Sequence, residues 1–124
     1  MLVHPLRLAL FLSWDCGFAL PLQMHFGVPT AREKECWNHV LKGHIAMDSL
    51  VWPKGLAGRQ LDAVARLALW KQGLDYQHGT GHGVGAFLNV HEDPQRMSLA
   101  QLPNPVAFDV GMTLSNEPGY YEDG

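Results

Sequence analysis

The chain has 124 residues, a net charge of −3 at neutral pH and 47% hydrophobic residues, so we expect one domain with a hydrophobic core. The slight negative charge argues against a nucleic-acid-binding protein, because such proteins carry an excess of basic residues. The only cysteines, Cys16 and Cys36, are too few for a disulfide framework, and we therefore expect reduced thiols in a cytoplasmic protein.

The first 23 residues differ in character from the rest of the chain. A short apolar run, Leu8 to Leu12, follows Arg7 and is similar to the core of a signal peptide. Asp15 interrupts this pattern, and no clear cleavage site follows it. The run is also too short to cross a bilayer. We interpret residues 1–23 as a leader separate from the domain, with secretion as the alternative, and we expect no membrane partner.

Two amphipathic helices are predicted next. Thr30 followed by Glu33 is the pattern of a capping box at a helix start. Helical spacing of apolar residues predicts a helix over residues 31–51 that ends before Pro53. A second helical pattern predicts a helix that ends near Gly73. The apolar positions are Trp37, Val40, Leu41, Ile45 and Leu50 in the first pattern and Leu61, Val64, Ala65, Ala68 and Leu69 in the second.

Three histidines then occur in a glycine-rich segment. They are His78, His82 and His91. Residues 84–90 are apolar enough for a strand, in which residues an odd number apart face opposite sides. His82 and His91 are nine residues apart, so a bulge or the glycine run must break the period if both face one site. We expect His78 to lie on a loop at the rim of that site.

The C-terminal part predicts a loop followed by a strand. Residues 92–109 contain three prolines and indicate a loop. Residues 111–117 form an apolar, strand-like run that ends at Glu117. Pro118 and Gly119 follow in the pattern of a type II turn. The Glu117 carboxylate is therefore expected at the end of a strand, next to a turn that fixes its orientation.

A histidine and a carboxylate on two extended segments are a plausible metal site. Imidazole suits transition metals and carboxylate suits harder ions, so His82 with Glu117 indicates manganese, cobalt, zinc or iron. Other interpretations remain open. His82 could be a hydrogen-bonded structural residue, His91 and Glu92 could form a surface ion pair, and Glu117 could be merely solvated. Tyr120 and Tyr121 are more often core or interface residues than catalytic ones.

Two longer motifs resemble a known family. HGTGHGVGAFLNVHEDP and GMTLSNEPGYYEDG are similar to the catalytic domain of aminopeptidase P, the Xaa-Pro aminopeptidase. Shorter motifs extend this resemblance over residues 24–124. It implies an α+β fold, namely an incomplete pita-bread domain of the creatinase/aminopeptidase type, with two helices followed by antiparallel strands.

The resemblance also implies an activity and residue roles. The reaction would be metal-assisted hydrolysis that releases the first residue from peptides with proline second, with two Mn²⁺ ions in a complete site. His82 and Glu117 would be metal ligands, and Glu117 would also be the base for the attacking water. His78 and His91 would bind substrate, pass protons and stabilise the tetrahedral intermediate.

The chain departs from the family in its carboxylates. The family uses five ligands, of which two upstream aspartates and a last glutamate have no counterpart here. Asp15 echoes the first aspartate only faintly, and the chain stops at Gly124, before the last glutamate. One imidazole and one carboxylate remain, whereas catalytic sites usually need three protein ligands. We therefore expect impaired hydrolysis, or alternatively a non-catalytic module that binds peptides or partners. Unpaired strand edges predict a homo-oligomer.

Overall fold

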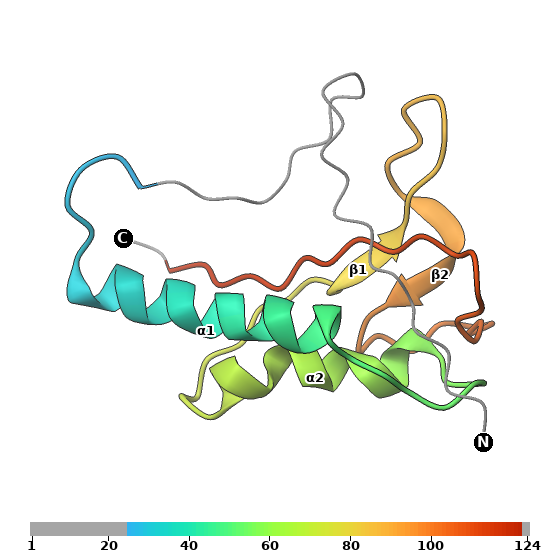
Figure 1. Cartoon of the computed structure of the whole chain (residues 1–124), viewed down its shortest axis with the longest axis horizontal. Helices are drawn as coiled ribbons and strands as arrows, with labels where there is room; N and C mark the ends of the chain where they lie inside the picture. Colours follow the sequence, from blue (N-terminus) through green and yellow to red (C-terminus); the bar gives the residue numbers. More distant parts are fainter. Residues whose placement is uncertain (1–24, 123–124) are drawn as a thin grey trace.

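A computed structural model describes residues 25–122 of the chain. Its elements are α1 (Ala31–Asp48), α2 (Gly58–Trp70), β1 (Gly81–Gly83) and β2 (Glu92–Met97). Figure 1 shows the two helices packed on each other, the strands beyond the end of α1, and the C-terminal segment running back along α1. The predicted α+β order of two helices and then antiparallel strands is confirmed. The expected leader, Asp15 and Cys16 lie outside the described residues.

Helix α1 begins as predicted and ends slightly earlier. The Thr30 side chain accepts from the Glu33 amide, and the Glu33 carboxylate accepts from the Thr30 amide, which completes the capping box. The helix ends at Asp48, not at residue 51, because Ser49 caps it. The Ser49 hydroxyl donates to the Ile45 carbonyl at 2.7 Å, which satisfies a carbonyl of the last turn.

Helix α2 begins where its first residue touches β2. A Cβ on Gly58 would overlap the carbonyl oxygen of Arg96, so only glycine permits this approach. The Gln60 side chain accepts from the Ala57 amide at 2.8 Å. After Trp70 the chain turns through Gly73, whose φ of +70° explains the predicted stop. The core between the helices and β2 contains Met47, Trp52, Leu61, Ala65, Met97, Phe108 and Leu114.

The predicted positions of the first strand and of the loop after it are wrong. Residues 84–90, predicted as a strand, form a loop whose tip residues Phe87 and Leu88 have φ values of +52° and +65°. The first six residues of the predicted loop 92–109 form β2 instead. The reason is burial: Phe87 and Leu88 are almost fully exposed, while Gln95 and Met97 of β2 are buried. Apolar composition here did not mark a strand that faces the core.

The predicted strand over residues 111–117 is an extended segment that is not assigned as a strand, although it pairs with the free edge of β1. The Ser115 amide donates to the His82 carbonyl at 2.8 Å, and the Glu117 amide donates to the Thr80 carbonyl at 2.7 Å. The expected type II turn after Glu117 is absent, because Gly119 does not adopt the positive φ that this turn requires. The chain instead continues beside α1.

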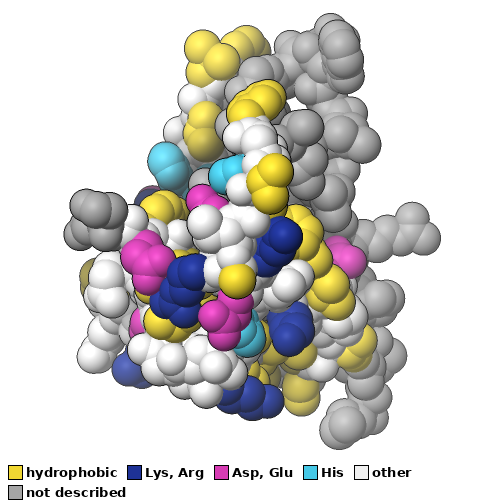
Figure 2. Space-filling view, turned by 90° about the vertical axis from the view of Figure 1, so that its left-hand side faces the viewer, with side chains coloured by type: hydrophobic (Ala, Val, Ile, Leu, Met, Phe, Trp, Pro, Cys, Tyr) yellow, Lys and Arg dark blue, Asp and Glu magenta, His cyan; other side chains and the backbone are white. Residues whose placement is uncertain are grey.

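The C-terminal segment is attached to the start of α1 by charged and polar groups. The Arg32 guanidinium contacts the Glu122 carboxylate at 3.0 Å and the Tyr120 hydroxyl at 3.2 Å. Figure 2, which views the molecule from the side where α1 begins, shows basic and acidic side chains intermingled on this face. Within residues 25–122, neither helix is both long and apolar enough to span a membrane.

Candidate functional site

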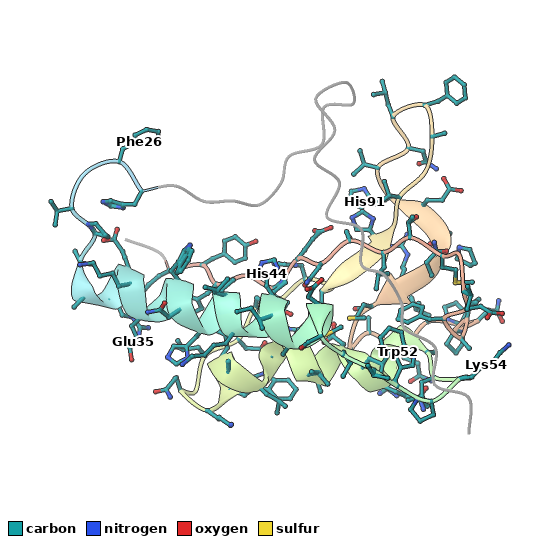
Figure 3. All side chains as sticks on the ribbon, in the orientation of Figure 1. Phe26, Glu35, His44, Trp52, Lys54 and His91 are labelled. Atoms are coloured by element: carbon teal, nitrogen blue, oxygen red, sulfur yellow. The ribbon has the colours of Figure 1, made fainter. Side chains whose placement is uncertain are left out.

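A break in the strand register brings His82 and His91 to the same side. Gly81 and His82 pair with Met97 and Arg96, but Gly83 pairs with Glu92, so the register shifts between His82 and Gly83. The two imidazole rings consequently lie 4.3 Å apart between centroids. His91 itself precedes β2 and is exposed, and Figure 3 shows it above β1. The register shift therefore places His82 and His91 on the same side although they are nine residues apart, as the sequence analysis required.

The pairing between β1 and the C-terminal segment brings Glu117 to His82. His82 Nε2 and Glu117 Oε1 are 2.8 Å apart. The His82 amide also donates to the Ser115 hydroxyl at 3.0 Å. A Cβ on Gly81 would overlap the Ser115 carbonyl, so the close contact between the two segments depends on this glycine. A histidine and a carboxylate 35 residues apart in sequence thus become neighbours.

The hydrogen bonds of His82 define how its ring can act. His82 Nδ1 lies 2.6 Å from the Gly83 carbonyl, which can only accept, so Nδ1 carries a proton. In the neutral ring, the Nε2 lone pair then faces the Glu117 carboxylate. Two acceptors at 2.8 Å need a proton or a cation between them. A backbone carbonyl that fixes the Nδ1 proton is the usual support of a metal-binding histidine.

The donor set fits one side of a metal site. The His82 side chain is 11% exposed and the Glu117 side chain 37%, so both are accessible to a small ion. Among residues 25–122, no group of three or more histidine, cysteine, aspartate or glutamate side chains is arranged to hold a metal. One imidazole and one carboxylate are fewer than the three protein ligands usual in catalytic sites. The described residues therefore fit a metal only in part.

His78 lies on a bend before β1, exposed as expected for a residue at a rim. Its Nδ1 donates to the Gly79 carbonyl at 2.8 Å, and its Nε2 accepts from the Tyr121 hydroxyl at 3.0 Å. The rings of Tyr76 and Tyr121 flank it at 4.8 Å and 5.5 Å between centroids. Tyr121 is therefore a partner of His78, a role that its sequence position alone did not indicate.

A buried arginine holds the segment that carries His78, and sequence reasoning missed it. Arg66 donates to Asp62 at 2.5 Å and to Asp75 at 2.8 Å. It also donates to the carbonyls of Tyr76 and His78, at 2.6 Å and 2.7 Å. We call Asp62, Arg66, Asp75 and Tyr76 the Arg66 cluster. The signal that could have revealed it was the pair Asp62 and Arg66, four residues apart among the apolar residues of α2.

His44 is a second residue near the site that the sequence did not mark. Its carbonyl accepts from the Asn116 side chain at 3.0 Å, which joins α1 to the segment that carries Glu117. Burial lowers the pKa of His44, and the negative charge of Glu117 opposes this effect. Figure 3 shows His44 at the junction between α1 and the C-terminal segment. No ligand spacing in the sequence could have predicted this neighbourhood.

The comparisons with known proteins agree on one family. Residues 17–124 match the model of metallopeptidase family M24. The chain is similar to Xaa-Pro aminopeptidase 1 of Dictyostelium discoideum, with 54% identity over 101 residues, 82% of this chain and 16% of that protein. It is also similar to aminopeptidase P2 of Arabidopsis thaliana, with 60% identity over 100 residues, 81% of this chain and 14% of that protein. The chain thus spans about a sixth of the length of these relatives.

Two solved structures share the fold. One is the X-prolyl aminopeptidase of Caenorhabditis elegans, described as a cytosolic enzyme with a di-nuclear active site. It matches with a TM-score of 0.71 and 42% identity, over 77% of this chain and 15% of that one. The other is an Xaa-Pro dipeptidase of Bacillus anthracis, with a TM-score of 0.65 and 32% identity, over 79% of this chain and 26% of that one.

Proposed function

The chain belongs to metallopeptidase family M24, and from this premise we propose that it carries part of the site of an Xaa-Pro aminopeptidase. Its substrates would be peptides with proline second, from which the first residue is released. The observation that carries this proposal is the His82–Glu117 pair, in which the imidazole Nε2 and a carboxylate oxygen lie 2.8 Å apart. The names of the relatives and of the nematode structure support the same substrate class.

We assign His82 and Glu117 as ligands of a divalent metal, with Mn²⁺ as the first candidate. Such an ion would polarise the scissile carbonyl and make the attacking water more acidic. Glu117, with its second carboxylate oxygen, would accept the proton of that water. His91 lies beside His82 and would bind or protonate the substrate on the same side. His78, oriented by Gly79 and Tyr121, would do so from the rim.

A non-catalytic role is the alternative, and a specific observation favours it. The described residues supply two metal ligands and not the three or more that catalysis usually needs. A module with this site would retain peptide or partner binding and lose hydrolysis. Whichever role applies, we place the protein in the cytoplasm. The description of the nematode enzyme as cytosolic supports that location.

The first test measures metal binding and hydrolysis separately. Calorimetric titration with MnCl₂ is compared for the wild type, His82→Ala and Glu117→Gln, with His39→Ala as the control that removes a histidine from α1 outside the site. Release of the first residue is then followed with a peptide that has proline second and with a matched peptide that has alanine there. We expect weak binding that both site variants abolish and His39→Ala retains.

The outcomes distinguish the two roles. Hydrolysis of the proline peptide that His82→Ala abolishes would support the peptidase. Metal binding that needs His82 and Glu117, without hydrolysis, would support the binding module. Binding unaffected by both site variants would show that the pair holds no metal, and the proposal would then fail. His82→Ala should change the free energy of unfolding by less than about 1 kcal/mol, because this pair is partly exposed.

A further inference from the structure

The imidazole of His91 is held differently from the other two histidines of the candidate site. The rings of His78 and His82 are hydrogen-bonded to backbone carbonyls, and His78 also to a tyrosine hydroxyl. The exposed ring of His91 forms no hydrogen bond or ion pair with any residue in the range 25–122, and its ring contact is with His82. The position of this ring beside His82 therefore depends on the backbone that carries it.

The backbone of His91 is enclosed by a hydrogen bond between two side chains. The Asn89 side-chain amide donates to the Glu92 carboxylate, and only Val90 and His91 lie between these two residues. Glu92 is also held by its backbone, which pairs with Gly83 across the register shift. The side-chain bond thus closes a small ring of covalent and hydrogen-bonded atoms that includes the backbone of His91.

Asn89 is held from the other side of the same loop. Its backbone carbonyl accepts from the Gly85 amide at 2.9 Å, and its backbone amide donates to the Ala86 carbonyl at 3.1 Å. A Cβ on Gly85 would overlap the Glu92 carboxylate. The glycine therefore leaves the space in which the carboxylate lies beside Asn89, and both sides of the loop contribute to this contact.

The tip of the loop needs such support, because its own sequence does not favour its conformation. Phe87 and Leu88 have φ values of +52° and +65°, and the Asn89 amide donates to the Ala86 carbonyl across them. This is the pattern of a type I′ turn, which Asn-Gly favours and which bulky residues adopt at a cost in free energy. Packing does not offset that cost, since the Phe87 and Leu88 side chains are almost fully exposed. The contacts of Asn89 are therefore the stabilising element of the loop.

We propose that Asn89 and Glu92 are positioning residues for His91, which keep its imidazole beside His82 and on the substrate side of the site. A hydrogen bond to a carboxylate is stronger than one between neutral groups, so it can hold this segment although it is exposed. A proton is transferred only to a group within hydrogen-bond reach, and a displaced His91 would no longer act on the substrate. The role of His91 itself rests on the proposed function.

The test is NMR of the metal-free full chain with labelled histidines, in which the nuclear Overhauser effect between the rings of His82 and His91 is measured. Asn89→Asp would place a second carboxylate against Glu92, and we expect the effect between the rings to be lost. Glu92→Gln keeps an oxygen acceptor for Asn89 and should retain it. The double variant Asn89→Asp/Glu92→Gln exchanges donor and acceptor and should restore it.

The matched control is Asn38→Asp, which makes the same change at an exposed position of α1. Circular dichroism shows whether each variant folds. If Asn89→Asp does not fold, Glu92→Ala and Glu92→Gln are compared, because both remove the charge and only the first removes the acceptor; we then expect the loss in Glu92→Ala alone.

Several results would overturn the proposal. They are a wild-type chain without the effect between the rings, its retention in folded Asn89→Asp, its loss in Glu92→Gln, and the failure of the double variant to restore it. Equal intensities in Glu92→Ala and Glu92→Gln would count against it in the same way. None of these results depends on metal or hydrolysis, so a failure of the peptidase assignment is recognised separately, in the MnCl₂ titration of His82→Ala and Glu117→Gln.

Discussion

The Arg66 cluster and the His82–Glu117 pair hold the two ends of the short segment 76–82, and they differ in burial and in their number of partners. Arg66 and Asp62 are 2% and 0% exposed, and the guanidinium makes four hydrogen bonds. Glu117 is 37% exposed on its side chain, and its carboxylate contacts only His82 among the hydrogen bonds and ion pairs of the described residues. The arginine is held by four hydrogen bonds in a buried position, whereas the glutamate has one such contact and remains accessible.

The residues that hold this segment in position are therefore different from the residues proposed to bind a ligand. Burying a charge is costly unless it is hydrogen-bonded, so the position of the Arg66 guanidinium is tied to the geometry in which its four hydrogen bonds form. It fixes the carbonyls of Tyr76 and His78 and therefore the path into β1. His82 and Glu117, in contrast, are joined to each other by a single contact between their side chains. Stability and ligand binding should respond to different substitutions, which the following experiments examine.

The largest expected effect is the loss of the arginine. Arg66→Ala removes four hydrogen bonds and leaves Asp62 buried without its cation. We expect the free energy of unfolding to fall by about 3–5 kcal/mol, measured by urea denaturation. Arg59→Ala is the control, because it removes an exposed arginine from the same helix. A loss at Arg66 no larger than at Arg59 would contradict the supporting role.

A second expected effect is a loss of stability in alkali. Burial raises the pKa of Tyr76 to about 12 from 10.0, against the opposing effect of its hydrogen bond with Thr80. Because the folded state holds this proton more tightly, the contribution is fully present below pH 10 and is lost as the pH rises from 10 to 12. The loss would be roughly 2–3 kcal/mol. Urea denaturation at a series of alkaline pH values measures it.

Tyr76→Phe is the control for this pH dependence. Phenylalanine cannot ionise, so the variant should show a shallower fall in stability between pH 10 and 12. It should also be less stable than the wild type at neutral pH by about 1 kcal/mol, because Thr80 loses its buried partner. Equal pH dependence in both proteins would mean that Tyr76 does not govern the alkaline transition.

The last prediction tests the connection between the two regions. Gly81→Ala would force the Ser115 carbonyl away from β1 and carry Glu117 away from His82. We expect a loss of about 1–3 kcal/mol, together with weaker Mn²⁺ binding in calorimetry. Gly79→Ala is the control, because its Cβ would lie 3.1 Å from the Met97 carbonyl and leave the segment with Glu117 in place. Unchanged Mn²⁺ binding in Gly81→Ala would show that the contact between Gly81 and Ser115 does not govern metal binding.

Local signals predicted the helices well. The capping box at Thr30 and the stop at Gly73 act within a few residues, so the sequence contains the complete interaction. The strands depend on partners distant in sequence. Residues 84–90 are apolar but meet no core, whereas β2 is polar and is buried at Gln95, which donates to the Thr113 carbonyl, and at Met97, which belongs to the core. Composition could not distinguish these two cases.

The sequence indicated the residues of the candidate site but not the residues that hold them in position. The motifs identified His78, His82, His91 and Glu117, and the structure brings His82 next to both His91 and Glu117. The roles of these residues remain predictions. Arg66, Tyr121 and His44 were missed, because their contacts with the site arise only from packing between segments far apart in the chain.

The register shift at His82 also bears on which changes in length the chain can tolerate. Gly83 and Glu92 pair and close a loop whose tip, at Phe87 and Leu88, is exposed. We expect a residue inserted at this exposed tip to leave the pairing of Gly83 with Glu92 in place. His82 and His91 each stand next to a residue of this closing pair, which accounts for their closeness in space better than the length of the loop does. The tip is therefore the position at which we would graft a short peptide tag for labelling close to the candidate site.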